Sequence, residues 1–221
     1  MEVSFMSNAK QIDQLLEGFL KRGLPGCGLK VVQYGNTLYE GYFGVTDIDT
    51  KTPVTKDTLF RQASMSKIPL YTVMMMLYER GKFLLTDPIG DYLPEWKTST
   101  RYDRHPNGYV DIVPTSRPIN IRDVMSMKCG LPYCNSAAPT HDLVMTGMQE
   151  CMQPLWEKGS YTLKEHLSAM SKAPLACDPG THWIYGFSSE LAAGIIEAVC
   201  DKPVNDVFKE MLFDPLGMKD T

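Results

Sequence analysis

Ser64 and Lys67 are the first residues in the chain whose types and spacing could do chemistry. They stand three apart in the segment 64–67, Ser-Met-Ser-Lys, so on a helix both side chains lie on one face, one turn apart. A hydroxyl at the N-terminal end of a helix is a candidate nucleophile, and a neighbouring lysine can help to remove its proton. The pattern predicts an activated serine for acyl transfer.

A second copy of the same motif limits what this spacing establishes alone. Residues 7–10 read Ser-Asn-Ala-Lys, and we interpret this copy as a helix cap followed by a surface lysine. Support for Ser64 must therefore come from elsewhere in the chain.

Tyr185 supplies that support, because it stands at a turn before an apolar helical segment, in the stretch 179–187, Pro-Gly-Thr-His-Trp-Ile-Tyr-Gly-Phe. A tyrosine placed there could carry a proton between Ser64 and a leaving group. The alternative is that Tyr185 and Trp183 only pack on the core. A Tyr-x-Asn pattern also begins at Tyr133, but it lacks the Pro-Gly-Thr lead, and we set it aside.

The elements that would position these residues follow from hydrophobic periodicity. The N-terminal segment predicts an amphipathic helix with Ser7 or Asn8 as its N-cap. A hairpin follows, with strands over 28–34 and 37–43 joined by a Gly-Asn turn at 35–36. A central helix is predicted over about residues 64–80, with Pro69 in an early turn. Its buried side is expected to consist of Ile68, Leu70, Val73, Met74, Leu77 and the neighbouring methionines.

The rest of the chain is predicted to be mostly helical. Residues 85–95 predict a short turn-helix, and the polar, Pro-containing stretch 96–117 predicts a surface loop. Helical patterns then follow at 120–128, 141–158, 162–172, 188–200 and 204–213.

Composition excludes several other classes of protein. The 221 residues are 43% hydrophobic and 22% charged, which is typical of a globular protein. No apolar run reaches the roughly 18 residues of a membrane helix, and a net charge of −4 argues against a nucleic-acid partner. The first helix is amphipathic rather than a secretory signal, so we expect a cytoplasmic protein.

Cysteine and histidine usage predicts neither a disulfide framework nor a metal site. The six cysteines are irregularly spaced and contain no CxxC, and the four histidines are scattered without an HExxH motif. We therefore expect reduced thiols, no metal and no cofactor.

Six stretches, taken in order, resemble the serine β-lactamase and penicillin-binding-protein superfamily. The resemblance is strongest to its branch of class C β-lactamases, family VIII esterases, D-aminopeptidases and statin-type acyltransferases. The matching stretches are 60–67, 79–88, 92–95, 121–132, 178–185 and 213–221, of which the last reads Phe-Asp-Pro-Leu-Gly-Met-Lys-Asp-Thr.

The resemblance implies a role for each matching residue. Ser64 would be the acylated nucleophile, with its backbone N–H as one half of the oxyanion hole, and Lys67 would be its helper. Tyr185 would be the general base and acid, and Trp183 and Phe187 would line the substrate pocket. The implied substrate is a small ester, amide or lactam.

Three departures from the family pattern bear on function. Phe187 stands where the family carries Asn or Ser after the tyrosine, which weakens a β-lactamase reading and favours an esterase or acyltransferase. The segment 127–130, Met-Lys-Cys-Gly, lacks the family's common histidine, for which we expect a structural consequence only. The family's third motif, a Lys/His-x-Gly strand that gives the second oxyanion donor, has no match downstream.

The implied fold is α/β (α+β) and β-lactamase/transpeptidase-like: an antiparallel sheet flanked by helices, with the sheet incomplete in this chain, plus an all-helical domain. We expect residues 1–81 to form the N-terminal part of the α/β domain and residues 82–221 the helical domain. The C-terminal strands of the sheet would be absent, with Tyr185 at the junction facing Ser64.

Two kinds of function remain open from the sequence. The first is a serine hydrolase that forms an acyl-enzyme on Ser64, either a carboxylesterase or a β-lactamase or D-amino-acid peptidase proper. The second is a non-catalytic fragment or binding module, which needs a missing C-terminal segment or a second chain to complete the sheet. The absent oxyanion strand favours the second, because losing one oxyanion donor costs a factor of roughly a hundred to a thousand in rate.

Overall fold

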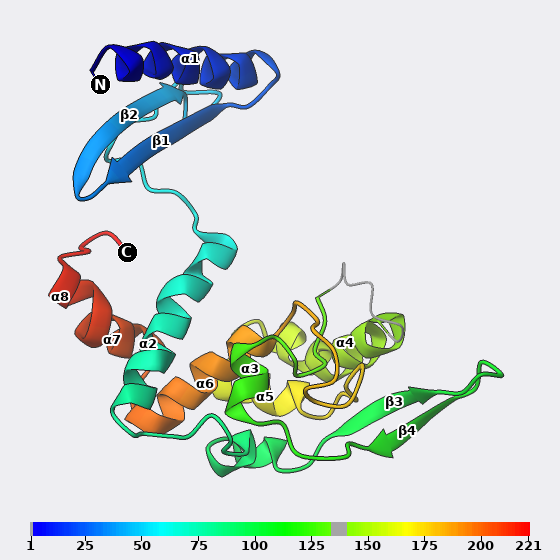
Figure 1. The fold of residues 1–221 in the computed structure, drawn as a ribbon. Coiled ribbons are helices and arrows are strands. Elements are labelled where there is room, and N and C mark those ends of the chain that lie inside the picture. The colour runs from blue at the N-terminus through cyan, green and yellow to red at the C-terminus, as the bar shows by residue number, and fades with distance from the viewer. Residues whose placement is uncertain (1, 134–140) are drawn as a thin grey trace. The chain divides into compact units, whose positions relative to one another are not determined.

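The computed structural model describes residues 2–133 and 141–221, and the chain divides after Arg61 into two compact units (Figure 1). Unit 1 ends at Arg61 and unit 2 runs from Gln62 to Thr221. The segment 134–140, which holds Cys134 and most of the Tyr-x-Asn pattern, lies outside the described residues. The expected boundary between residues 81 and 82 stays a prediction.

Unit 1 consists of helix α1 (Glu2–Lys21) and an antiparallel hairpin of β1 (Gly26–Gln33) and β2 (Asn36–Gly44). The predicted N-cap at Ser7 or Asn8 is wrong, because α1 already begins at Glu2 and both residues lie inside it. The helix packs on the hairpin, where the Tyr39 hydroxyl donates to Asp13.

The hairpin turn lies one residue earlier than predicted. A register shift between Val31 and Val32 changes the pairing of the strands near their tips. As a result Tyr34 and Gly35, with φ of 49° and 78°, take the two left-handed positions that a tight hairpin turn requires.

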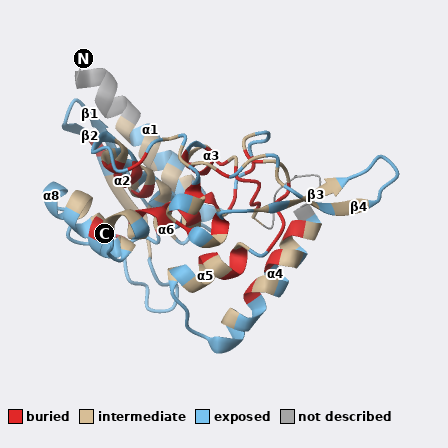
Figure 2. Cartoon of the chain, turned by 90° about the horizontal axis from the view of Figure 1, so that it is seen from below, coloured by how far each residue is buried: buried red, intermediate tan, exposed pale blue. Residues whose placement is uncertain are grey.

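The core of unit 2 lies where helix α6 (Ser188–Cys200) packs against α2 (Lys67–Glu79), α3 (Ile121–Met125), α5 (Leu163–Met170) and α7 (Val204–Phe208). Helix α4 (His141–Lys158) covers α5. Figure 2 shows buried residues gathered on α5, α6 and the segments beside α3. Shorter turns complete the unit: 3₁₀ turns η1 (Ala63–Ser66), η2 (Ile89–Asp91) and η3 (Pro94–Trp96), the π segment η4 (Lys209–Phe213) and α8 (Asp214–Leu216).

Helix α2 buries Leu70, Val73, Met74 and Leu77, as its periodicity predicts. Pro69 lies in its first turn, where a missing N–H costs no helical hydrogen bond. Ile68 and the neighbouring methionine Met75 were predicted to be buried and are instead 68% and 41% exposed. Two residues before Leu70 is about 200° around the helix, so Ile68 lies on the opposite face.

The segment 96–117 is not the surface loop that its polarity predicted. It contains a second antiparallel hairpin, β3 (Thr100–Arg104) with β4 (Val110–Pro114). A partner distant in sequence anchors β3: Leu175 exchanges backbone hydrogen bonds with Thr100 and Tyr102, at 2.8 and 2.9 Å. Among the described residues, no helix combines the length and apolar character needed to cross a membrane.

Candidate active site

Ser64 lies in a tight turn directly before α2. The turn is η1, and Lys67 is the first residue of the helix that follows it. Ala63 precedes the serine with φ of 47°, a left-handed conformation that costs a non-glycine residue roughly 1–3 kcal/mol. This sharp turn leaves Ser64 exposed at the N-terminal end of α2, where the helix dipole favours negative charge.

The side chains of Ser64, Lys67 and Tyr185 converge. The Tyr185 hydroxyl donates to Ser64 Oγ at 2.7 Å, and Lys67 Nζ donates to the same oxygen at 3.3 Å. Tyr185 and Ser64, whose hydroxyl oxygens meet here, are 121 residues apart in the chain. The structure therefore brings these three sequence-selected side chains together, while their catalytic roles, and that of the Ser64 backbone N–H as an oxyanion donor, stay predictions.

Backbone pairing between two loops positions Tyr185. Phe187 N–H donates to Leu131 O at 2.9 Å, and Ile184 N–H donates to Met127 O at 2.8 Å. Gly186 lies between them, and a Cβ added there would stand 1.7 Å from Leu131 O. Only glycine allows the two loops to approach this closely, so the residue after Tyr185 is fixed by sterics.

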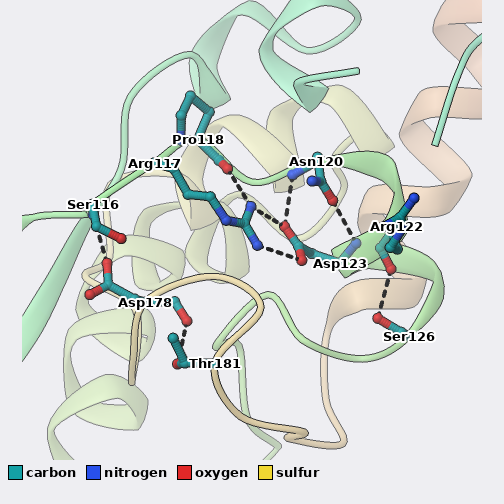
Figure 3. A network of polar contacts seen from close by, with 9 residues as sticks. All are labelled: Ser116, Arg117, Pro118, Asn120, Arg122, Asp123, Ser126, Asp178 and Thr181. Atoms are coloured by element: carbon teal, nitrogen blue, oxygen red, sulfur yellow. Dashed lines mark hydrogen bonds and ion pairs between the residues drawn. The ribbon is translucent and has the colours of Figure 1, made fainter. Parts of the chain in front are cut away.

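A polar network around α3 supports the same loops (Figure 3). Arg117 donates two hydrogen bonds to the buried carboxylate of Asp123, at 2.6 and 2.9 Å, and the Asn120 N–H donates a third at 3.0 Å. The Asp123 backbone oxygen then accepts from Lys128 N–H at 2.8 Å, and Lys128 O accepts from Gly180 N–H at 2.8 Å. The network links α3 to the segment that leads to Tyr185, and it does so although the family's usual histidine at 127–130 is absent.

The surroundings of Tyr185 favour its ionised form. Hydrogen bonds with Ser64 and Lys67 lower the pKa of Tyr185 below its ordinary value of 10.0. Lys67 Nζ also lies 5.0 Å from the centre of the Tyr185 ring. A lowered pKa increases the fraction of Tyr185 that is phenolate, and therefore able to accept a proton, near neutral pH.

Aromatic side chains surround the three residues on one side. The ring of Tyr133 meets Tyr185 edge-to-face at 5.5 Å and Phe187 at 4.6 Å, and Trp183 lies 6.3 Å from Tyr185. Trp183 is 65% exposed, whereas Phe187 packs against the core at the start of α6. The expected pocket roles of Trp183 and Phe187 stay predictions.

A cavity of about 440 Å³ opens beside Ser64 between α2, α6 and α7. Ser64, Lys67, Tyr133 and Glu190 line its polar side. Its other walls are mostly apolar: Leu70, Ala193, Val204 and Phe208. Neither Trp183 nor Phe187 lines this cavity.

Sequence reasoning missed Tyr133 and Glu190. Tyr133 was set aside as a chance Tyr-x-Asn match, and its place depends on the pairing of two loops distant in sequence. Glu190 did carry a signal, since it is the one charged residue in the otherwise uncharged segment 186–196.

Within the described ranges, 2–133 and 141–221, no group of three His, Cys, Asp or Glu side chains could hold a metal ion.

Comparison with known proteins gives one consistent result. The family model described as Beta-lactamase matches residues 12–221. Esterase EstB from Burkholderia gladioli is 25% identical over 217 residues, which are 97% of this chain and 51% of EstB. This chain therefore spans about half the length of such a relative.

Solved structures agree with this comparison. EstCE1, a hydrolase with promiscuous acyltransferase activity, matches with a TM-score of 0.78 and 25% identity over 97% of this chain and 53% of that one. Simvastatin synthase (LovD) from Aspergillus terreus matches with a TM-score of 0.77 and 22% identity, over 96% of this chain and 53% of LovD. The predicted fold class is confirmed.

Proposed function

This chain belongs to the beta-lactamase family, and from that premise we propose that it is a serine hydrolase acting on carboxylic esters or amides through an acyl-enzyme on Ser64. The observation that carries the proposal is the pair of hydrogen bonds at Ser64 Oγ, 2.7 Å from the Tyr185 hydroxyl and 3.3 Å from Lys67 Nζ. Ser64 Oγ as nucleophile, Tyr185 as base and Lys67 as the cation that stabilises the ionised base then lie within hydrogen-bond distance of one another.

In the proposed mechanism, Ser64 Oγ attacks the substrate carbonyl carbon while its proton passes to the Tyr185 phenolate. The Lys67 ammonium stabilises that phenolate beforehand. Tyr185 returns the proton to the leaving alkoxide or amine as the carbon–heteroatom bond breaks, which leaves acyl-Ser64. A water molecule then gives its proton to Tyr185 and attacks the acyl carbon, and the carboxylic acid leaves as Ser64 recovers its proton.

Esters are the substrates that the site favours. Phe187 occupies the position where the family's Asn or Ser would supply a polar side chain, and its ring packs on Tyr133 at 4.6 Å. Without an amide there, a lactam's acylamino group loses a partner, whereas a simple ester does not need one. An ester substrate also agrees with the relatives EstB, an esterase, and EstCE1, a hydrolase with promiscuous acyltransferase activity.

The competing candidate is a non-catalytic binding module that needs a further segment or a second chain. The 221 residues, which span about half the length of EstB, contain no Lys-x-Gly or His-x-Gly after Tyr185. A site without the family's second oxyanion donor would still position Ser64, but it would stabilise the tetrahedral intermediate poorly.

Covalent labelling tests the proposal directly. A fluorophosphonate probe should label the parent chain at Ser64, and Ser64→Ala should remove the label. Ser66→Ala, in the same turn, is the matched control and should label normally. Equal labelling of the parent and Ser64→Ala would refute the proposal.

A burst of nitrophenol from a nitrophenyl ester, measured in parallel, should accompany the label. No burst from a chain that labels at Ser64 would favour the binding module. Rapid nitrocefin turnover would contradict the interpretation of Phe187.

A further inference from the structure

Glu190 is a half-buried residue beside the proposed active site for which the mechanism above has no use. It lies in the first turn of α6 and lines the same cavity as Ser64 and Lys67. Its Oε1 accepts a hydrogen bond from the Tyr133 hydroxyl at 3.3 Å, while its Oε2 is buried without a hydrogen-bond partner among the described residues. A carboxylate oxygen that is removed from water without a hydrogen-bond partner costs free energy, which suggests that Glu190 has a function at this position.

Tyr133 connects Glu190 to the residues that act on Ser64. Its ring lies 5.5 Å from Lys67 Nζ and meets the Tyr185 ring edge-to-face, with centroids 5.5 Å apart. One side chain therefore contacts both the proposed base and the cation beside it. The far end of that side chain, its hydroxyl, is held by Glu190.

We propose that Glu190 is a positioning residue for acyl transfer: by accepting the Tyr133 hydroxyl, it fixes the ring that holds Lys67 and Tyr185 at Ser64. The inference rests on the proposed function. Besides its hydrogen bond to Ser64, Lys67 Nζ lies over the rings of Tyr133 and Tyr185, and Glu190 accepts the hydroxyl of the Tyr133 ring.

The electrostatics of the two tyrosines agree with this assignment. Burial and the neighbouring Glu190 raise the pKa of Tyr133, whereas the hydrogen bonds with Ser64 and Lys67 lower the pKa of Tyr185. Tyr133 therefore stays a protonated donor while Tyr185 is the one that ionises. Neighbouring groups whose environments move their pKa values apart are typical of sites that divide acid and base roles.

The test is the rate at which a fluorophosphonate labels Ser64 in the full chain. Glu190→Leu should slow labelling by about tenfold, the effect of one lost positioning hydrogen bond. Glu190→Gln keeps a carbonyl oxygen that accepts from Tyr133, so it should label within about twofold of the parent. Tyr133→Phe keeps the ring but loses the donor, and it should match Glu190→Leu, with no further loss in the double variant.

Glu197→Leu is the matched control for general damage to α6. It removes another hydrogen bond made by that helix, the 3.0 Å bond from Val204 N–H to Glu197 Oε1, and should lower the melting temperature without slowing the labelling. If the parent does not label at Ser64, the proposed function fails. If the parent labels and Glu190→Leu labels equally fast, or Glu190→Gln is as slow as Glu190→Leu, the positioning role is wrong.

Discussion

Replacing Tyr185 by Phe removes one oxygen, the one that lies 2.7 Å from Ser64 Oγ. If Tyr185 is the general base, its loss should slow acylation by roughly a hundred- to ten-thousandfold, which corresponds to about 2.7–5.4 kcal/mol of transition-state stabilisation. The same change should alter stability little, because Tyr185 is 38% exposed and a typical hydrogen bond contributes about 0.5–1.5 kcal/mol.

The assay is the second-order rate of fluorophosphonate labelling, with thermal unfolding measured in parallel. Tyr92→Phe is the matched control, since it loses a hydroxyl that donates to Asp87 at 2.8 Å in another part of unit 2. Labelling should fall steeply in Tyr185→Phe alone. A drop of less than about tenfold, or an equal drop in Tyr92→Phe, would refute Tyr185 as the base, because a true general base contributes more than that.

Three further predictions concern the supports of the site. The labelling rate of the parent should fall as the pH is lowered, because the phenolate of Tyr185 is the active form. Because the pKa of Tyr185 is lowered, the rate should reach its plateau at a pH below 10.0, the ordinary tyrosine value. A rate that is constant from pH 5 to 10 would contradict this. Gly186→Ala should lower the free energy of unfolding in urea by about 1–3 kcal/mol and slow the labelling, because the new Cβ would stand 1.7 Å from Leu131 O. The control Gly18→Ala, in open space on α1, should not destabilise the protein. Arg117→Ala should cost about 3–5 kcal/mol, because it strips two hydrogen bonds from the buried Asp123 carboxylate, and an unfolding midpoint equal to the parent's would argue against the network.

Long, strongly periodic segments were the easiest part of the fold to predict. The bounds of α4 and α6 match the predicted 141–158 and 188–200, because apolar spacing is a local property of the chain. The hairpin β3–β4 was missed because Leu175 anchors it through backbone hydrogen bonds, and such a partner leaves no mark on the polar sequence of the strands. Its Asn107-Gly108 turn was the one local sign.

The candidate site divides in the same way. Ser64 and Lys67 are separated by one helical turn, so their proximity follows from spacing alone. Tyr185 was selected from its position at a turn before a helical segment and from the family resemblance, since nothing local connects it with Ser64. Tyr133 and Glu190 needed the structure, because their contact joins positions 57 residues apart.

The antiparallel bridge between Pro132 and Gly186 has a consequence for motion. Two backbone hydrogen bonds join the two loops here: Tyr133 N–H donates to Tyr185 O at 3.4 Å, and Phe187 N–H donates to Leu131 O at 2.9 Å. Each tyrosine is therefore in or next to one of these bonds. A local opening that breaks one of these hydrogen bonds exposes the other to solvent. The amide hydrogens of Tyr133 and Phe187 should therefore exchange with solvent through the same opening. The two rings would then leave Lys67 together, and the site would open as a unit rather than one side chain at a time.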